Sequence, residues 1–406
     1  MKIAFNAIRV SKKAGSGFDT FIINFLNEFA RYVYSNKLNI EFDVYTLYPQ
    51  HFPEVKKENI KQVKLPFVKQ KLNTAKNNKI YIKKQNKLFH FFTFSFINFL
   101  ADYFRMFWAQ FVFPFFAKNY DLVVNLTQFE ASVLNKKRQV VIVYDLIPYI
   151  FKNQQRHKYA FFVYTILPYI LRRVKNICVV SNNTKLDLIN ILGINESKIV
   201  TIYAAVDRII EVYSKQNFDS EKRVFFEKIG LNIKKYLLFV GSNDKRKNLE
   251  NVIKAFDIIC EKVKDLGLIV VGFLTNKDFS YYELTVKNFK KIKFLGHVDT
   301  KDLIFLYKSA EVFLFPTLYE GFGLPPLEAM ACGCPVVVSN KGALPEVCGD
   351  AAVYVDPYDP QSIAEGVIKV LSDEKLRQSL IQKGYHQVKK FSWENSVAKF
   401  LEVLNY

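Results

Sequence analysis

The sequence has few residues of the types that build metal and disulfide sites. Only five cysteines and five histidines occur among 406 residues, and no cysteine stands at metal-ligand spacing beside a histidine. We expect the pair Cys332 and Cys334 to pack as small core side chains, with a metal site as the less favoured alternative. Scattered cysteines fit a reducing compartment, so the expected location is the cytoplasm, with the inner face of the cytoplasmic membrane as an extension of it.

Acidic residues are also scarce. The 38 Asp and Glu residues stand against 58 Lys and Arg residues, which gives a formal net charge of +20. This charge can reflect lysines spread over solvated surfaces, or a partner that is an anionic membrane, an anionic small substrate or a nucleic acid. We expect no nucleic-acid partner, because the sequence has no helix-turn-helix, no aromatic RNA-binding signature and no Cys/His finger.

Long apolar runs at membrane-spanning or signal-peptide length are missing as well. The N-terminal MKIAFNAIRVSKKAG lacks the apolar region of a signal peptide, and the aromatic run 88–100 is shorter than the ~20 residues that span a bilayer. Half of the residues are nevertheless hydrophobic. The chain can therefore bury a large core, and its length predicts two or three domains.

Short apolar runs bounded by turn residues recur along the whole chain, with helical patterns between many of them. Strands that alternate with helices predict parallel sheets covered on both faces, hence an α/β fold. The predicted strands are 2–6, 42–47, 122–126, 140–144, 177–181 and 199–202, then 237–241, 268–272, 294–296, 312–315, 336–339 and 352–355. The predicted helices are 21–34, 155–175, 184–192, 249–263, 300–309 and 360–390, with a last helix after Ser392. The polar segment 207–235 divides the two series and is predicted to connect them.

The stretch from Phe315 to Gly349 carries the clearest functional pattern. A glycine-rich loop, Glu320-Gly321-Phe322-Gly323, follows a predicted strand, and Pro325-Pro326 open a helix after it. Free N–H groups at the start of a helix suit an anion such as phosphate. Glu320 and Glu328 flank this segment, and we place Glu328 in the first helical turn. Two carboxylates beside a phosphate-binding loop indicate a ligand with both hydroxyls and phosphates, such as a nucleotide sugar.

A basic turn follows the first strand of the second series. The strand ends at Gly241, and Lys245, Arg246 and Lys247 come before the next helix. These cations can be ordinary surface residues or can clamp a diphosphate, which Arg contacts with a planar fork and Lys as a point charge.

Residues 56–116 are unusual in composition. Eleven lysines occur in 56–87, and 88–116 is densely aromatic. The two alternatives are a loop followed by core helices, or a basic and aromatic surface that rests on anionic lipid headgroups.

In the first half, the loop Ala14–Gly17 lies between a predicted strand and helix, although its spacing is not the dinucleotide fingerprint. Asp145 directly follows a buried strand, at the sheet edge where such folds bind ligands.

These motifs together resemble the retaining glycosyltransferases of family 4, which have the GT-B fold of two Rossmann-like domains facing each other across a cleft. The likeness is strongest over 236–406, where YEGFGLPPLEAMACGCPVVVSN contains two glutamates separated by seven residues. GSNDKRKN resembles the diphosphate turn of that family, and VIVYDLIPYIF, CVVSNNTKLDLI and YAAVD follow its order in the first half. The implied domains are 1–208 on the acceptor side, 209–388 for the nucleotide sugar, and a helix 389–406 that returns to the first domain.

The resemblance implies roles for individual residues. The candidate catalytic groups are Glu320, Arg246, Lys247 and Asp145. The implied donor-binding residues are Gly15, Gly17, Gly241, Ser242, Arg246, Lys247, His297, Val298, Glu320, Gly321, Phe322, Gly323, Leu324 and Glu328. Arg246 and Lys247 would hold the diphosphate, Glu320 the sugar hydroxyls and Glu328 the ribose. The sequence departs from the family twice, because Tyr144 stands where many members have His and Ser242 stands where an Arg often follows the glycine.

The expected function is transfer of a mannose- or glucose-like hexose from a GDP- or UDP-linked donor to a glycan or lipid-linked acceptor, in cell-surface polysaccharide or glycolipid synthesis. No cofactor is expected, and no metal is required, because cations and a helix end would stabilise the leaving diphosphate. We also expect the two domains to close over the donor, with 207–235 as the hinge. The alternative is a catalytically inactive GT-B-fold protein that binds an anionic membrane or a polyanion through its basic first domain.

Overall fold

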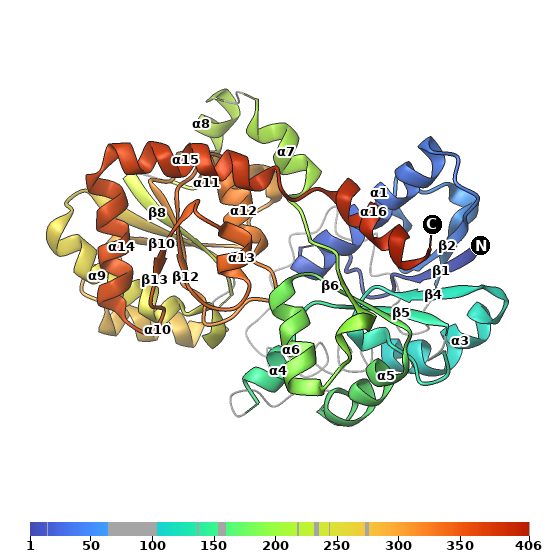
Figure 1. The fold of residues 1–406 in the computed structure, drawn as a ribbon. Helices are drawn as coiled ribbons and strands as arrows, with labels where there is room; N and C mark the ends of the chain where they lie inside the picture. Colours follow the sequence, from blue (N-terminus) through green and yellow to red (C-terminus); the bar gives the residue numbers. More distant parts are fainter. Residues whose placement is uncertain are drawn as a thin grey trace, which may run out of the picture.

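Two parallel sheets form the framework of the molecule (Figure 1). The computed structural model describes residues 1–13, 15–63, 104–135, 138–152, 160–216, 219–230, 235–242, 244–272 and 276–405. Within these residues, the first half forms a seven-stranded sheet and the second half a six-stranded sheet. Helices cover both, so the predicted α/β architecture with two sheets is confirmed.

The first sheet has the strand order β3-β2-β1-β4-β5-β6-β7, and all neighbours are parallel. Its strands are β1 (Lys2–Asn6), β2 (Glu41–Thr46), β3 (Ile60–Gln62), β4 (Leu122–Asn125), β5 (Gln139–Val143), β6 (Asn176–Val179) and β7 (Ile199–Thr201). The edge strand β3 was not predicted. Its sequence Ile-Lys-Gln is largely exposed, so it carries no apolar run that would mark a strand.

The second sheet has the order β10-β9-β8-β11-β12-β13, again entirely parallel. Its strands are β8 (Lys235–Val240), β9 (Leu266–Val271), β10 (Ile292–Gly296), β11 (Val312–Phe315), β12 (Val336–Ser339) and β13 (Ala352–Val355). The chain runs outward from β8 to β10 and then returns to β11 beside β8. In open parallel sheets, ligands bind at such a reversal, outside the carboxyl ends of the strands. The loops that follow β8 and β11 therefore lie at the edge of the sheet where a ligand is expected.

Helices pack on both faces of the two sheets (Figure 1). The α-helices are α1 (Gly17–Ser35), α3 (Phe113–Phe116), α4 (Ile147–Ile150), α5 (Leu167–Arg173), α6 (Asn182–Leu192), α7 (Arg208–Ser214), α8 (Asp219–Lys228), α9 (Leu249–Lys262), α10 (Asn276–Thr285), α11 (Thr300–Ser309), α12 (Leu324–Ala331), α13 (Leu344–Cys348), α14 (Pro360–Ser372), α15 (Glu374–Val388) and α16 (Trp393–Val403). Two π-helical segments, η3 (Trp108–Val112) and η6 (Phe162–Ile166), precede α3 and α5. The 3₁₀ segments are η1 (Pro49–His51), η2 (Lys57–Asn59), η4 (Ala117–Asn119), η5 (Gln128–Glu130), η7 (Glu196–Lys198), η8 (Lys245–Lys247) and η9 (Phe289–Lys291).

The prediction of one long helix over 360–390 is wrong. The backbone is extended at Asp373, with φ −120° and ψ 95°, and this residue separates α14 from α15. The Asp373 carboxylate accepts a hydrogen bond from the N–H of Leu376 at 2.9 Å. Asp is a strong N-cap residue, so it starts a second helix where the apolar pattern alone suggested continuity.

The segment 207–235, predicted as the connection between the halves, contains the helices α7 and α8. Helix α7 packs against α11 and α12 of the second half. Ile210 of α7 is 1% exposed, so this part of the segment belongs to a packed core rather than to a solvated linker.

The last helix, α16, returns to the first half and lies against α1 (Figure 1). The ring of Phe400 packs 5.3 Å from that of Phe25, and the indole N–H of Trp393 donates to the carbonyl of Val206 at 3.0 Å. Ser392 caps this helix through the N–H of Asn395 at 3.1 Å, as predicted. The domain boundaries at 208 and 388 stay predictions.

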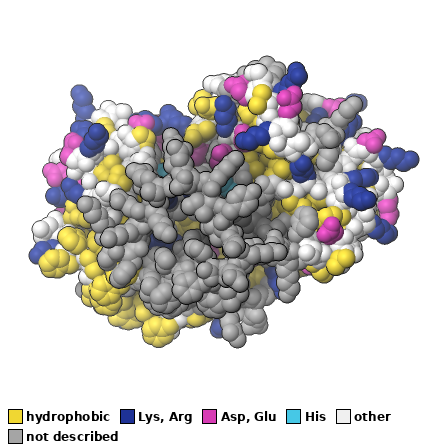
Figure 2. All heavy atoms as spheres, turned by 180° about the vertical axis from the view of Figure 1, so that it is seen from behind, with side chains coloured by type: hydrophobic (Ala, Val, Ile, Leu, Met, Phe, Trp, Pro, Cys, Tyr) yellow, Lys and Arg dark blue, Asp and Glu magenta, His cyan; other side chains and the backbone are white. Residues whose placement is uncertain are grey.

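Apolar side chains gather at one end of the first half, at the lower left when the molecule is seen from behind (Figure 2). Among the helices that the structure describes, none combines the length and the apolar character needed to cross a bilayer. Of the lysine-rich and aromatic stretch 56–116, residues 64–103 lie outside the described residues.

Candidate functional site

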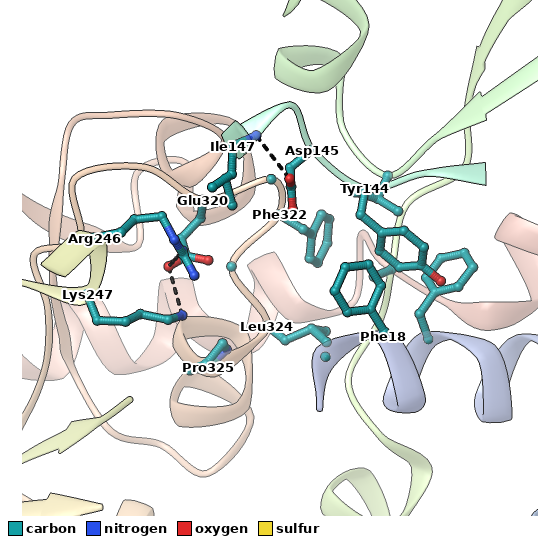
Figure 3. Close-up of a pocket in the computed structure, with 16 residues that line it drawn as sticks. Phe18, Tyr144, Asp145, Ile147, Arg246, Lys247, Glu320, Phe322, Leu324 and Pro325 are labelled. Atoms are coloured by element: carbon teal, nitrogen blue, oxygen red, sulfur yellow. Dashed lines mark hydrogen bonds and ion pairs between the residues drawn. The ribbon is translucent and has the colours of Figure 1, made fainter. Parts of the chain in front are cut away.

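A cavity of about 240 Å³ lies between the two halves, at the carboxyl ends of both sheets (Figure 3). The second half contributes the loop after β8 and the loop after β11, and the first half contributes the start of α1 and the loop after β5. The lining residues are Gly17, Phe18, Phe21, Tyr144, Asp145, Ile147, Val180, Ala204, Arg246, Lys247, Glu320, Gly321, Phe322, Gly323, Leu324 and Pro325. The structure therefore brings nine of the predicted site residues into one cavity.

The basic turn after β8 is built as a short 3₁₀ segment, η8. Asp244 accepts the N–H of Arg246 at 3.0 Å and so caps its first turn. Asn248 ends it with a left-handed backbone, φ 65°, and its amide donates to the carbonyls of Pro316 and Pro357. The N–H of Leu318 donates to the carbonyl of Arg246 at 2.8 Å. These bonds fasten the turn to the loop after β11 and aim its side chains into the cavity.

Arg246 and Lys247 converge on one carboxylate oxygen. Arg246 Nη1 lies 2.6 Å and Lys247 Nζ 2.8 Å from Glu320 Oε1, and all three side chains are largely buried (Figure 3). Burial strengthens the interaction of these charges with one another and with a ligand. Arg246 Nε also lies 3.9 Å from Asp244 Oδ2, so two carboxylates face the two cations at this cavity wall. The Nε atom of Arg246 is buried and has no hydrogen-bond partner among the described residues, so the guanidinium retains donor capacity.

The glycine-rich loop after β11 carries the start of α12. Gly323 has φ 106°, a left-handed conformation that suits glycine. Of the four N–H positions that lack partners at a helix start, two belong to Pro325 and Pro326 and have no hydrogen. The amides of Gly323 and Leu324 are therefore the donors that this helix end can offer, and both residues line the cavity.

Gly321 makes the closest approach between the two halves. A Cβ atom there would overlap the carbonyl oxygen of Tyr144 and lie 2.9 Å from the Cβ of Asp145. The Ser181 hydroxyl donates to the carbonyl of Gly321 at 2.6 Å, and the Thr184 hydroxyl donates to the carbonyl of Tyr144 at 3.0 Å. Contacts from the start of α6 thus hold the loop of the second half against the strand end of the first.

Glu328 occupies a different position from the one predicted. Helix α12 begins at Leu324 because Gly323 ends the loop, so Glu328 lies in the second turn and not in the first. It does not line the 240 Å³ cavity. The Tyr307 hydroxyl donates to Glu328 Oε2 at 3.1 Å, and burial raises the pKa of Glu328 to about 7.

On the opposite wall, Asp145 follows β5 and faces the cavity (Figure 3). Its Oδ1 atom accepts the N–H of Ile147 at 3.0 Å. Burial raises the pKa of Asp145 to about 6, which outweighs the opposing effects of that hydrogen bond and of Arg246. This carboxyl therefore changes its charge near neutral pH.

Tyr144 is 8% exposed and packs edge-on against Phe18 at 4.5 Å and Phe21 at 5.2 Å. Its hydroxyl is buried without a hydrogen-bond partner among the described residues. Burial and the nearby carboxylates of Glu130 and Asp19 raise its pKa well above the ordinary value, so the phenol stays neutral.

The glycine loop after β1 is organised by Asp19. This carboxylate accepts the N–H and hydroxyl of Ser11, both at 2.8 Å, and the N–H and hydroxyl of Ser16 at 3.1 and 2.8 Å. Gly17 lines the central cavity, whereas Gly15 and His297 line a second cavity of about 410 Å³. A Cβ atom on Gly15 would lie 3.6 Å from His297 Cε1, so these two residues meet across the cleft.

Gly241, Ser242 and Val298 lie outside the central cavity. Gly241 is partly buried beside the Cβ of Lys247, Ser242 is exposed, and Val298 packs against the main core. The structure thus groups Gly241 with the basic turn and leaves Ser242 at the surface.

Several cavity residues were missed from the sequence. They are the apolar side chains Phe18, Phe21, Ile147, Val180 and Ala204. Phe21 stood in the predicted helix pattern, but apolar periodicity does not separate a core residue from one that borders a cavity. Among the described residues, no group of three or more His, Cys, Asp or Glu side chains is placed to hold a metal ion.

Residues 221–387 match the family model of the glycosyl transferases group 1. The second half of this chain is therefore similar to that family. The match includes the basic turn, the glycine-rich loop and both glutamates, which are the parts of the site that the second sheet contributes.

Two curated relatives extend this result. The chain is 39% identical over 163 residues to O-antigen chain mannosyltransferase B of Escherichia coli, which covers 39% of this chain and 43% of that protein. It is 31% identical over 247 residues to the capsular polysaccharide biosynthesis glycosyltransferase CapM of Staphylococcus aureus, which covers 58% of this chain and 61% of that protein. The chain thus spans less than two thirds of the length of each.

Solved structures resemble the whole chain. WaaG, a glycosyltransferase involved in lipopolysaccharide biosynthesis, superposes with a TM-score of 0.66 at 17% identity and covers 99% of both chains. Anabaena HepE in complex with UDP-glucose gives a TM-score of 0.69 at 15% identity and covers 100% of this chain and 99% of that chain. These likenesses establish the GT-B fold.

Proposed function

We propose that this protein is a retaining glycosyltransferase that moves a hexose from a nucleoside-diphosphate sugar to a hydroxyl group of a glycan or lipid-linked acceptor. The observation that carries the proposal is the convergence of Arg246 and Lys247 on Glu320 at the start of α12. The similarity of residues 221–387 to the glycosyl transferases group 1 supports it.

The cavity wall of the second half has the chemistry that a leaving diphosphate requires. Breaking the bond between sugar and diphosphate develops negative charge on the phosphate oxygen and positive charge on the sugar ring. Arg246, Lys247 and the amides of Gly323 and Leu324 are fixed beside one another before any reaction, so little reorganisation accompanies charge development. In this proposal they bind the diphosphate, without a metal ion.

Glu320 has two tasks in the proposed mechanism. Its Oε1 atom accepts hydrogen bonds from both cations and holds them in position. When a diphosphate binds to Arg246 and Lys247, the Glu320 carboxylate becomes free to accept hydrogen bonds from sugar hydroxyls. Retention of the anomeric configuration belongs to the proposal through the resemblance to the retaining family.

The donor enters when the two halves separate. The cavity of about 240 Å³ is smaller than the ~300–1,000 Å³ of typical ligand pockets, and a nucleotide sugar is a large ligand. We propose that the halves open to admit the donor and close over it, with 207–235 as the hinge.

The preferred sugar is mannose. The preferred role is in the synthesis of cell-surface polysaccharides. The relatives are named for O-antigen and capsular polysaccharide synthesis, and one structural neighbour holds UDP-glucose. The donor is accordingly a GDP- or UDP-linked hexose.

A donor screen tests the proposal. The purified chain is incubated with GDP- and UDP-hexoses, with and without an oligosaccharide or polyprenyl-linked acceptor, and released nucleoside diphosphate is measured. Acceptor-dependent release from one donor is expected, together with thermal stabilisation by the matching nucleoside diphosphate. A protein that is stabilised by neither GDP nor UDP and releases neither would be the inactive alternative.

A further inference from the structure

An aromatic surface covers one end of the first half. It consists of Phe107, Phe111, Phe115, Phe116, Leu134 and Phe161, which are between 52% and 72% exposed. Figure 2 shows apolar side chains gathered at this end, and Figure 1 places α3 and α5 there. Contiguous exposed apolar surface of this kind is uncommon on soluble proteins and marks an interaction site.

The helix that carries four of these phenylalanines is apolar on two sides. Ala109, Phe113 and Ala117 are at most 1% exposed, and Phe113 and Ala117 pack in a core cluster with residues of the first sheet. Phe107, Phe111 and Phe115 occupy the other side at a spacing of four residues. A soluble protein normally places polar residues on the outer side of such a helix, so the outer aromatic stripe is not needed for the core.

Residues 131–135 continue the same surface, and a second helical segment lies at the same end of the first half. The Gln110 side chain bonds to the backbone of Ala131 and Val133, and this brings the exposed Leu134 beside η3. Met106 packs against the core cluster that contains Phe162 of η6, next to the exposed Phe161. Both helical segments therefore pack on the same core cluster of the first half.

Cations lie at this end of the first half. One stacks on a ring of the aromatic surface, and another stacks on Tyr169 of α5, which is 38% exposed. Lys118 Nζ lies 4.8 Å from the ring centre of Phe115, and the Arg173 guanidinium lies 3.6 Å from that of Tyr169. Arg138 donates from Nη1 to the carbonyl of Lys118 at 3.1 Å, which keeps a third cation at the same end. The sequence has no Asp or Glu in 104–119, 131–138 or 160–175.

We propose that this aromatic surface binds the headgroup region of an anionic phospholipid bilayer. Aromatic side chains partition into the interface, and bordering Lys and Arg residues attract anionic headgroups. A second copy of the chain fits less well, because a symmetric contact sets the same face against itself and would oppose cations that have no acidic partner there.

The position of the surface suits a membrane-held acceptor. Arg105 belongs to the same helical segment and lines the 410 Å³ cavity beside Gly15 and His297. The helix therefore runs from the mouth of the cleft to the cations at this end of the first half, so an acceptor anchored in the bilayer would reach the cleft. Access of a bilayer-anchored acceptor to the cleft rests on the proposed transferase function, but the binding of vesicles does not.

Vesicle co-sedimentation of the full chain tests the proposal without any donor. The probes are vesicles of phosphatidylcholine alone and of phosphatidylcholine mixed with phosphatidylglycerol, at low and high salt. We expect binding only to the anionic vesicles, weakened by salt. Phe111→Ser with Phe115→Ser should weaken it at least tenfold, and Lys118→Gln and Arg173→Gln by about fivefold each.

Tyr358→Ser is the matched control, because Tyr358 is 62% exposed on the second half and its loss should leave binding unchanged. Thermal melting of each variant shows that it is folded, as expected for exposed positions. Three outcomes overturn the proposal: no binding to anionic vesicles, binding that the double phenylalanine variant retains, or a dimer in solution that this variant abolishes. Each leaves the proposed transferase activity untouched.

Discussion

Gly321 lies so close to Tyr144 that any side chain at position 321 would collide with the Tyr144 carbonyl oxygen. The two halves can therefore make this contact only with glycine at position 321 of the glycine-rich loop after β11. The same carbonyl accepts the Thr184 hydroxyl at 3.0 Å, so the contact cannot relax without breaking buried hydrogen bonds.

Gly321→Ala should destabilise the protein by about 1–3 kcal/mol, the usual cost of forcing atoms into a packed site, and should reduce transfer strongly. Gly17→Ala is the control, since a Cβ atom there meets nothing within 4 Å. Melting curves of the two variants check the prediction. Equal melting temperatures for both would contradict the close contact.

Tyr144→Phe removes a buried hydroxyl that has no partner among the described residues. Since an unsatisfied buried polar group costs about 1–3 kcal/mol, the variant should be as stable as the parent or more stable. Tyr307→Phe is the matched comparison, because its hydroxyl donates to Glu328 at 3.1 Å and its loss should destabilise. Urea unfolding distinguishes the two, and a clear loss of stability in Tyr144→Phe would show that its hydroxyl has a partner.

The raised pKa of Glu328 predicts that the stability of the protein depends on pH. Its folded-state pKa is about 7, whereas an unfolded Glu titrates near ~4.3. The folded protein therefore binds the Glu328 proton more tightly than the unfolded chain does. The protonated carboxyl stabilises the fold fully below about pH 4, and this stabilisation is lost as the pH rises through about 7.

Glu328→Gln should remove this dependence. Its unfolding free energy relative to the parent should rise by about 2–4 kcal/mol between pH 4 and pH 8, given 1.36 kcal/mol for each unit of pKa difference. Unfolding in urea at several pH values measures the difference. A constant difference over that range would mean that Glu328 is ionised throughout.

The raised pKa of Asp145 predicts that the transfer activity depends on pH. Its pKa of about 6 means that the carboxyl is neutral in mild acid and charged at pH 8. If the charged form faces the donor sugar, transfer should fall as the pH drops through about 6. Asp145→Asn mimics the neutral form, so its rate at pH 8 should match the parent near pH 5 and should show no further decline there. A variant profile parallel to that of the parent would contradict this role.

Most of the second half could be predicted from the sequence. Its strands are continuous apolar runs, and β8 and β11 end in loops whose glycines and charges mark the site. Arg246, Lys247 and Glu320 could be assigned because the basic turn and the glycine-rich loop resemble motifs of a known glycosyltransferase family. Their mutual ion pairs could not be foreseen, because the sequence does not say which oxygen each cation reaches without a ligand.

Some features of both halves could not be predicted. In the first half, strand β3 has no apolar run. In the second half, the caps at Asp373 and Gly323 shift helix boundaries by amounts that decide where side chains point. Glu328 was misplaced by one turn for that reason. Phe18 and Phe21 border the cavity only because α1 crosses the cleft, which depends on how the two halves meet and not on local pattern.

The most direct test of the central claim compares two lysines in the same short turn. Lys247 binds Glu320 in the cavity, whereas Lys245 is exposed. Acceptor-dependent release of nucleoside diphosphate from the preferred donor is measured for Lys247→Ala, Lys245→Ala and the parent. We predict that Lys247→Ala loses at least a hundredfold in rate, about 2.7 kcal/mol of transition-state stabilisation, with its melting temperature nearly unchanged, and that Lys245→Ala behaves like the parent. Equal rates for the two variants would contradict the account.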